Sequence, residues 1–193
     1  QLFGECIAIF FLLVSKKYKV FSFCELGPGN GTLMKDLIII LKKFIKDSMS
    51  FYLYEKSIFL KNLQIDNLSN FNTRSCKISF LKKPKFKKEP IFFFCNEFFD
   101  ALPIKQFKIE RDKILEKNFA LDKKNKIKEV FVKASASDIK IIKSFKTFKK
   151  LSFIELPKFG LQELKKMIKK ISKLKGCILM IDYGYLKPNN QNT

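Results

Sequence analysis

Residues 25–32 constrain the fold more than any other segment, because they place three glycines at alternating positions directly after an apolar run. The run from Val20 to Cys24 predicts a buried strand, which ends at the acidic Glu25, and a helical stretch begins near Leu33. A strand, a glycine-rich turn and a helix form the arrangement by which an α/β domain receives a nucleotide-like ligand. Glycine allows backbone dihedrals that other residues avoid and lets a ligand lie directly on the main chain. The segment therefore predicts an α/β fold with a ligand at this turn.

The spacing of the glycines indicates which ligand. The dinucleotide fingerprint G-x-G-x-x-G places phosphates on a helix N-terminus, whereas this chain has E-x-G-x-G-x-G with an acid at the strand end. An acid beside glycines suits a cationic, zwitterionic ligand better than a pyrophosphate. S-adenosylmethionine carries a sulfonium and an ammonium group and is the natural candidate; the alternative is a tight turn that binds nothing. The candidate cofactor-binding residues here are Glu25, Gly27, Pro28, Gly29, Asn30, Gly31 and Thr32.

Composition narrows the class of protein. The 193 residues suffice for one domain, and the mixture of 47% hydrophobic and 30% charged residues is typical of a globular protein. No apolar stretch reaches the roughly 18 residues of a membrane-spanning helix, and Ile7 to Val14 lacks the flanks of a secretory signal. The five cysteines form no C-x-x-C pair and the chain has no histidine, so we expect no metal site.

The net charge of +21 raises the question of a nucleic-acid partner. Only Arg74 and Arg111 among the 39 basic residues are arginine, and Phe, Ile, Asn and Lys are all abundant. An A/T-rich coding sequence would produce this bias, with Lys filling exposed positions. A nucleic-acid partner is thus possible but not favoured.

The order of elements predicts a parallel sheet with crossover helices, because strands and helices alternate. The strands are expected over Val20–Leu26, Phe51–Tyr54, Ile78–Leu81, Ile91–Cys95 and Cys177–Asp182, and the helices over Leu33–Lys46, Ile58–Leu68 and Leu161–Leu174. Shorter alternating strands over Lys105–Phe107, Ile114–Leu121 and Lys128–Val132 indicate an antiparallel insertion within about residues 104–150. The chain begins at Gln1 and ends in a polar tail from Lys187, so we expect a single domain, 1–193, truncated at both ends.

Glu55 closes the second predicted strand, where α/β nucleotide folds place an acid that accepts hydrogen bonds from ribose hydroxyls. A carboxylate can accept two such bonds from a cis-diol. The alternative is an exposed Glu at a helix start, with Ser57 as a possible cap. The position of Glu55, after the glycine segment, favours the ligand role.

Asn96-Glu97-Phe98-Phe99-Asp100-Ala101-Leu102-Pro103 follows the buried run Ile91–Cys95 directly. Ligands of open α/β sheets lie beyond the carboxyl ends of the strands, so Asn96 and Glu97 should face the same crevice as Glu25 and Glu55. A carboxylate there could pair with a guanidinium or ammonium group and orient the nucleophile for methyl transfer. Asp100 could be a second such carboxylate, or it could cap a turn before Pro103.

These motifs together resemble the MidA-like family of S-adenosylmethionine-dependent methyltransferases. The resemblance is carried by the following segments: Gln1-x-Phe3-Gly4-Glu5, Glu25-Leu26-Gly27-Pro28-Gly29-x-Gly31-Thr32-Leu33-Met34, Glu55-x-Ser57, Asn96–Pro103 and Asp182-Tyr183-Gly184-Tyr185. It implies a Rossmann-like class I methyltransferase sheet, and the family includes the mitochondrial protein arginine methyltransferase needed to assemble respiratory complex I. Family members usually begin well before Gln1, continue well past Thr193, and commonly carry a Trp before the Glu matching Glu116.

The resemblance further implies roles for individual residues. Glu25 and the three glycines would cradle the methionine part of the cofactor, Glu55 would hold the ribose, and Gly4 and Glu5 would stand nearby. The segment after Ile91–Cys95 would form the floor of the acceptor site, with Glu97 and Asp100 as the candidate catalytic carboxylates.

The resemblance therefore implies methylation of a protein at arginine, in the cytoplasm of a bacterium or the mitochondrial matrix of a eukaryote. The alternatives are an RNA methyltransferase that uses the lysine-rich surface, and a non-catalytic assembly factor that retains the cofactor fold.

Overall fold

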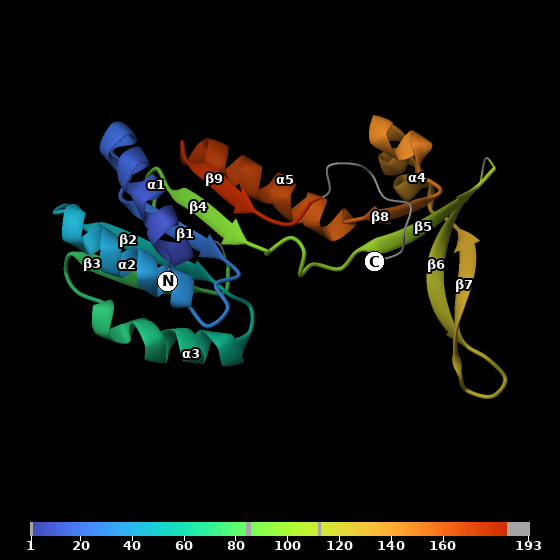
Figure 1. The fold of residues 1–193 in the computed structure, drawn as a ribbon, viewed down its shortest axis with the longest axis horizontal. Coiled ribbons are helices and arrows are strands. Elements are labelled where there is room, and N and C mark those ends of the chain that lie inside the picture. The colour runs from blue at the N-terminus through green and yellow to red at the C-terminus, as the bar shows by residue number, and fades with distance from the viewer. Residues whose placement is uncertain (1, 84–85, 112, 185–193) are drawn as a thin grey trace. The chain divides into compact units, whose positions relative to one another are not determined.

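A computed structural model describes residues 2–83, 86–111 and 113–184 of the chain (Figure 1). The described part of the chain divides into two compact units, one of residues 2–98 with Lys165–Asp182 and the other of Phe99–Leu164 with residues 183–184. The expected polar tail from Lys187 lies outside the described residues. Each unit contains one sheet, and the helix α5 (Lys158–Lys173) begins in the second unit and ends in the first.

The first unit contains the expected parallel sheet, in the order β3-β2-β1-β4-β9. Its strands are β1 (Ser22–Leu26), β2 (Met49–Tyr54), β3 (Cys76–Leu81), β4 (Phe92–Asn96) and β9 (Cys177–Ile181). All four strand pairs are parallel, and β1 lies at the centre of the sheet between β2 and β4. Because the strands run the same way, the segments after β1, β2 and β4 leave the sheet at one edge. That edge carries the glycine segment and the acids expected to bind the cofactor.

Aromatic residues at aligned positions of neighbouring strands stabilise the sheet by packing in one core. Phe23 of β1 is aligned with Phe51 of β2 and Phe92 of β4, and the rings of Phe23 and Phe51 stack with centroids 5.4 Å apart. On the same face pack α1 (Leu2–Tyr18) and α2 (Thr32–Phe44), which contribute Phe11 and several buried aliphatic side chains to one core. Burying each such side chain contributes about 1.5–3 kcal/mol. The helix α1 is not among the predicted elements, although it contains the apolar run Ile7–Val14.

The helix α3 (Ile58–Leu68) and a 3₁₀ turn, Ser69–Phe71, connect β2 to β3. α3 begins where expected because the Ser57 side chain accepts a hydrogen bond from the Leu60 backbone N–H at 3.3 Å. The opposite face of the sheet is covered near Phe93 by Phe86, whose ring also lies 5.9 Å from the ammonium group of Lys170 on α5. These helices complete a layered α/β unit.

The second unit contains an antiparallel sheet in the order β7-β6-β5-β8. Its strands are β5 (Lys105–Glu110), β6 (Lys113–Leu121), β7 (Ile127–Lys133) and β8 (Phe153–Leu156), accompanied by α4 (Ala136–Ser144) and a 3₁₀ turn, Lys146–Lys150. The prediction of a separate antiparallel sheet is confirmed, with β8 and α4 as additions. A small core forms around Phe107, which is fully buried.

Candidate functional site

The glycine loop, residues 27–31, joins β1 to α2 at the carboxyl edge of the parallel sheet. Gly27, Gly29 and Gly31 have φ angles of +64°, +56° and +85°, all in the left-handed region that side chains disfavour. The loop is anchored at both ends, since the Gly27 N–H donates to the carbonyl of Tyr54 on β2 at 3.1 Å and the Gly31 N–H donates to the Pro28 carbonyl at 2.8 Å. The backbone conformation at each of these three positions therefore favours glycine.

The surroundings of the three glycines differ. A Cβ at Gly27 would lie 2.6 Å from Cδ2 of Phe98, and one at Gly31 would lie 3.2 Å from Leu68 and 3.3 Å from Gln64. At Gly29 a Cβ would meet no atom within 4 Å in the described part of the chain. The loop is thus packed against protein at its two ends and open at its middle glycine, where a ligand can lie on the main chain.

Glu25 lies at the end of β1, immediately before the loop, and is only 3% exposed. Burial raises the pKa of its carboxyl group to about 8, against the opposing effect of a hydrogen bond from the Met34 backbone in the first turn of α2. Its second oxygen, Oε2, is buried and accepts no hydrogen bond from the residues that the structure describes. The sequence placed this side chain in an open crevice, whereas the structure places it beneath the loop and the α2 N-terminus.

Glu55 follows β2, the strand beside β1. Its Oε1 accepts hydrogen bonds from the backbone N–H groups of Lys56 and Ser57, each at 2.8 Å, and these bonds fix the carboxylate at the start of α3. Ser57 is the N-cap of α3. The helix-start geometry and a ligand role are compatible, because the two N–H groups occupy a single carboxylate oxygen.

Asn96 and Glu97 mark the carboxyl end of β4, the strand on the other side of β1. The Asn96 amide donates to Oε1 of Glu97 at 3.4 Å, and the Glu97 backbone N–H donates to the Ile181 carbonyl of β9 at 2.9 Å. Glu97 has a φ of +54°, which is uncommon for a residue with a side chain and is concentrated at functional sites. Glu97 is exposed and Asn96 half-buried.

Asp100 belongs to the second unit. It is exposed and lies in a turn closed by a hydrogen bond from the Leu102 N–H to the Phe99 carbonyl at 3.2 Å. The parallel-sheet edge therefore brings together Glu25, the glycine loop, Glu55, Asn96 and Glu97, whereas Asp100 is placed only within its own unit.

Gly4 and Glu5 lie in α1. Gly4 is buried against α2, since a Cβ there would lie 2.6 Å from Cβ of Asp36. Glu5 lines a groove of about 480 Å³ together with Thr32, the first residue of α2 after the glycine loop. The close approach at Gly4 thus brings Glu5 beside Thr32.

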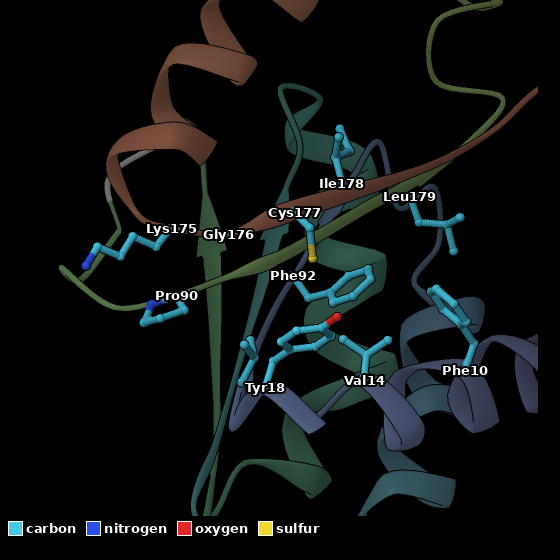
Figure 2. A pocket seen from close by; sticks show the side chains of 11 residues that line it. Phe10, Val14, Tyr18, Pro90, Phe92, Lys175, Gly176, Cys177, Ile178 and Leu179 are labelled. Carbon is cyan, nitrogen blue, oxygen red and sulfur yellow. The ribbon is translucent and has the colours of Figure 1, made fainter. Parts of the chain in front are cut away.

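A second hollow, of about 630 Å³, lies between α1 and the starts of β4 and β9 (Figure 2). Its lining is mostly apolar and includes Phe10, Val14, Tyr18, Phe92 and Leu179. It lies toward the amino ends of the parallel strands, whereas the glycine loop lies at the carboxyl ends. This hollow is therefore separate from the candidate cofactor site.

Two polar residues of α3 contact the glycine loop, and no sequence motif predicts these contacts. The Gln64 amide donates to the Gly29 carbonyl at 2.7 Å, and the Asn67 amide donates to the Asn30 carbonyl at 2.9 Å. Phe98, against Gly27, is a third contact residue beyond the predicted set. A spacing of three residues places Gln64 and Asn67 on one face of a helix, but this spacing alone does not show that the face meets the loop.

The donor set fits S-adenosylmethionine. Open space above Gly29 leaves room on the main chain, and the buried Oε2 of Glu25 would be stabilised in its ionised form by a nearby cationic group. No cluster of three or more His, Cys, Asp or Glu side chains suited to a metal ion occurs in residues 2–83, 86–111 and 113–184. Over the same ranges, no helix has both the length and the apolar character needed to cross a membrane.

Comparison with known proteins finds methyltransferases. A protein arginine methyltransferase of Xenopus laevis, NDUFAF7, is 27% identical over 212 residues, which cover 96% of this chain and 48% of that protein. The Caenorhabditis elegans homologue is 33% identical over 126 residues, covering 55% of this chain and 30% of that protein. Both relatives are named as mitochondrial.

The fold recurs in a solved structure from Burkholderia thailandensis that contains S-adenosyl-homocysteine. It has a TM-score of 0.73 and 15% identity, and the match covers 95% of this chain and 47% of that one. The chain thus spans about half the length of the Xenopus and Burkholderia proteins. A sequence profile described as "Putative S-adenosyl-L-methionine-dependent methyltransferase" matches residues 2–193. The chain belongs to this family of methyltransferases, whose cofactor is S-adenosyl-L-methionine.

Proposed function

We propose that this chain binds S-adenosylmethionine on the glycine loop and that its protein transfers the methyl group to an arginine of a protein substrate. The observation that most supports this proposal is that three glycines with positive φ occur together with carboxylates at the ends of strands β1 and β2. Membership of the family supports the cofactor. The name of the Xenopus relative supports arginine as the acceptor.

In this proposal the glycine loop and Glu25 hold the methionine part of the cofactor, and Glu55 accepts hydrogen bonds from the ribose. Ser57 supports Glu55 through its backbone N–H at 2.8 Å. The remaining proposed contacts are Gly4, Glu5, Pro28, Asn30, Thr32 and Asn96.

The bound cofactor would supply an electrophilic methyl group on a sulfonium, which a nucleophile displaces in line. Glu97 is exposed beside the loop and has its carboxylate oriented by the Asn96 amide at 3.4 Å. A carboxylate pairs with a guanidinium through charge-assisted hydrogen bonds. It can also accept the proton that the arginine nitrogen releases once it carries the methyl group. We assign this role to Glu97, with Asp100 as a second acidic residue for the acceptor.

Calorimetric titration with S-adenosylmethionine tests the binding half of the proposal. Gly29→Ala should weaken binding by about tenfold, because the new methyl group enters the open space in which the ligand would lie on the main chain. Gly160→Ala is the control, since its Cβ would make only ordinary contacts of 3.5 Å or longer. Absence of binding by the unchanged protein at millimolar cofactor would reject the proposed site.

The catalytic half is tested by incubating cell extract with heavy-methyl cofactor and a full-length version of the protein, followed by mass spectrometry. Glu97→Gln should retain cofactor affinity and abolish labelling of arginine, whereas Glu110→Gln, an exposed carboxylate of the second unit, should retain both. Loss of cofactor affinity in Glu97→Gln would reassign Glu97 to cofactor binding. Label recovered on RNA instead of protein would overturn the proposed acceptor.

The names of the relatives support a proposal for the partner and the location. We propose a protein substrate in the mitochondrial matrix for a eukaryotic source, where the protein would serve complex I assembly, and a cytoplasmic substrate for a bacterial source. The mitochondrial names of the Xenopus and Caenorhabditis relatives support the first case.

A further inference from the structure

Two side-chain amides of helix α3 donate hydrogen bonds to the glycine loop. Gln64 donates to the Gly29 carbonyl at 2.7 Å, and Asn67, one helical turn later, donates to the Asn30 carbonyl at 2.9 Å. The two carbonyls belong to consecutive residues at the open middle of the loop. The N-cap of the same helix is Ser57, two residues after Glu55. The helix α3 therefore connects the proposed ribose end of the site with its methionine end.

Gln64 is the more unusual of the two residues because it is fully buried. Its Nε2 bonds the loop, while its Oε1 accepts no hydrogen bond from any residue in the described ranges. An unpaired buried polar atom is costly, and an apolar side chain of similar shape would avoid that cost. The burial of an amide here is therefore poorly explained by stability and calls for a role in holding the loop.

The geometry of the peptide unit shows how the hydrogen bond from Gln64 orients the loop. No cis peptide occurs in the described residues, so each carbonyl points opposite to the next N–H. Fixing the Gly29 carbonyl toward Gln64 therefore turns the Asn30 N–H away from α3. A Cβ at Gly31 would lie 3.3 Å from Cγ of Gln64, so the helix also fits closely under the loop's last glycine.

We infer that Gln64, assisted by Asn67, is a positioning residue that presets the glycine loop for S-adenosylmethionine. This inference rests on the proposed cofactor site. Without the amide, the loop would have to be ordered when the ligand binds, which lowers affinity without removing any group that touches the ligand.

The test compares Gln64→Met and Gln64→Glu with Asn62→Leu, a change at an exposed position of α3. Gln64→Met removes the donor together with the unpaired acceptor. We expect its thermal midpoint to equal or exceed that of the unchanged protein, while affinity for S-adenosyl-homocysteine falls by about tenfold, the effect of one lost hydrogen bond. Asn62→Leu should leave affinity unchanged.

The pH dependence of affinity in Gln64→Glu is a measurement that would not change if Gln64 had only a structural role. Its ionised form cannot donate to the Gly29 carbonyl, whereas its protonated form can. Affinity of this variant should therefore recover as pH falls, relative to the unchanged protein measured in the same buffers. If Gln64→Glu does not fold, Asn67→Leu provides the second measurement, with a loss of affinity of a few fold expected.

Three results are decisive. Equal affinity of Gln64→Met and the unchanged protein would overturn the positioning role and leave the cofactor site intact. A parallel loss of stability and affinity in Gln64→Met would also overturn it, because it would identify Gln64 as an ordinary core residue. Failure of the unchanged protein to bind would overturn the proposed site and this inference together.

Discussion

Phe98 and Gly27 are in a close contact that joins the ends of β4 and β1: a Cβ at Gly27 would lie 2.6 Å from Cδ2 of Phe98. Phe98 directly follows Glu97. The packing of its ring against Gly27 therefore keeps the proposed catalytic residue near the glycine loop. The segment carrying the acceptor-side residue and the loop carrying the cofactor therefore share one packing contact.

We expect Gly27→Ala to destabilise the protein by about 2–4 kcal/mol, which combines left-handed strain with a clash against the Phe98 ring. Gly29→Ala, with a similar φ and open space, should cost only about 1–2 kcal/mol. Urea unfolding measures both. In a Phe98→Ala background the excess cost of Gly27→Ala should disappear, and its persistence would show that the ring is not responsible.

Glu25 makes stability depend on pH. Burial raises its folded-state pKa from 4.5 to about 8, so between these values the folded protein keeps a proton that the unfolded chain has lost. Stability should therefore fall as pH rises from about 4.5 to about 8, by a few kcal/mol at most. Glu25→Gln should flatten this component of the thermal midpoint profile and be more stable than the unchanged protein at pH 8. An unchanged slope would show that Glu25 is ionised in the free protein.

From the raised pKa of Glu25 we also predict how the affinity for S-adenosylmethionine depends on pH. A cationic ligand favours ionised Glu25, so binding should lower its pKa below about 8. Affinity for S-adenosylmethionine should then rise as pH increases toward 8 and level off above it. S-adenosyl-homocysteine, which lacks the sulfonium charge, should show a weaker rise. Glu25→Gln is the control, since titration of the ligand amine is common to both proteins; identical profiles in the two proteins would contradict the assignment.

The parallel sheet could be predicted from sequence because its signals are local. The apolar runs that became β1, β2 and β4 end at an acid or amide, and glycines follow β1. The helix α3 was predicted with its bounds, Ile58–Leu68, because Ser57 supplies a local cap. By contrast, β8 has four residues and α4 nine, too few for a periodic pattern to stand out from the surrounding lysines.

The missed site residues depend on contacts between distant segments. Gln64 meets Gly29 across 35 positions of the chain, and nothing in its neighbourhood distinguishes it from an exposed glutamine on a helix. Glu97, whose φ is +54°, likewise bonds through its backbone N–H to Ile181 on β9, far along the chain. Glu25 lies near the end of β1, where the sequence predicts it, but its burial follows from the packing of α2 on the sheet.

The second unit is organised around Asp138 of α4, whose side chain is fully buried. Its carboxylate pairs with Lys158 at 2.6 Å and with Lys105 of β5 at 3.0 Å, and it accepts a hydrogen bond from Ser135 at 2.8 Å. Burial alone would raise the pKa of Asp138, but the bonds from Lys158, Ser135 and Lys105 lower it to about 2. The ionised form therefore stabilises the folded unit.

We expect Asp138→Asn to destabilise the second unit by about 1–3 kcal/mol, because it removes the buried carboxylate that pairs with Lys158 and Lys105, while Lys105 keeps Glu116 at 2.8 Å. Hydrogen exchange of the β5 and β8 amides should accelerate, while the amides of β1 and β2 in the first unit serve as the internal reference. Glu110→Gln, on an exposed pair with Lys108, should change exchange little. Because the folded pKa lies below the ordinary 3.8, the contribution of Asp138 is complete above about pH 4 and is lost as pH falls through about 2. The difference between Asp138→Asn and the unchanged protein should therefore shrink in that acid range, and a constant difference would show that the ion pairs are not its source.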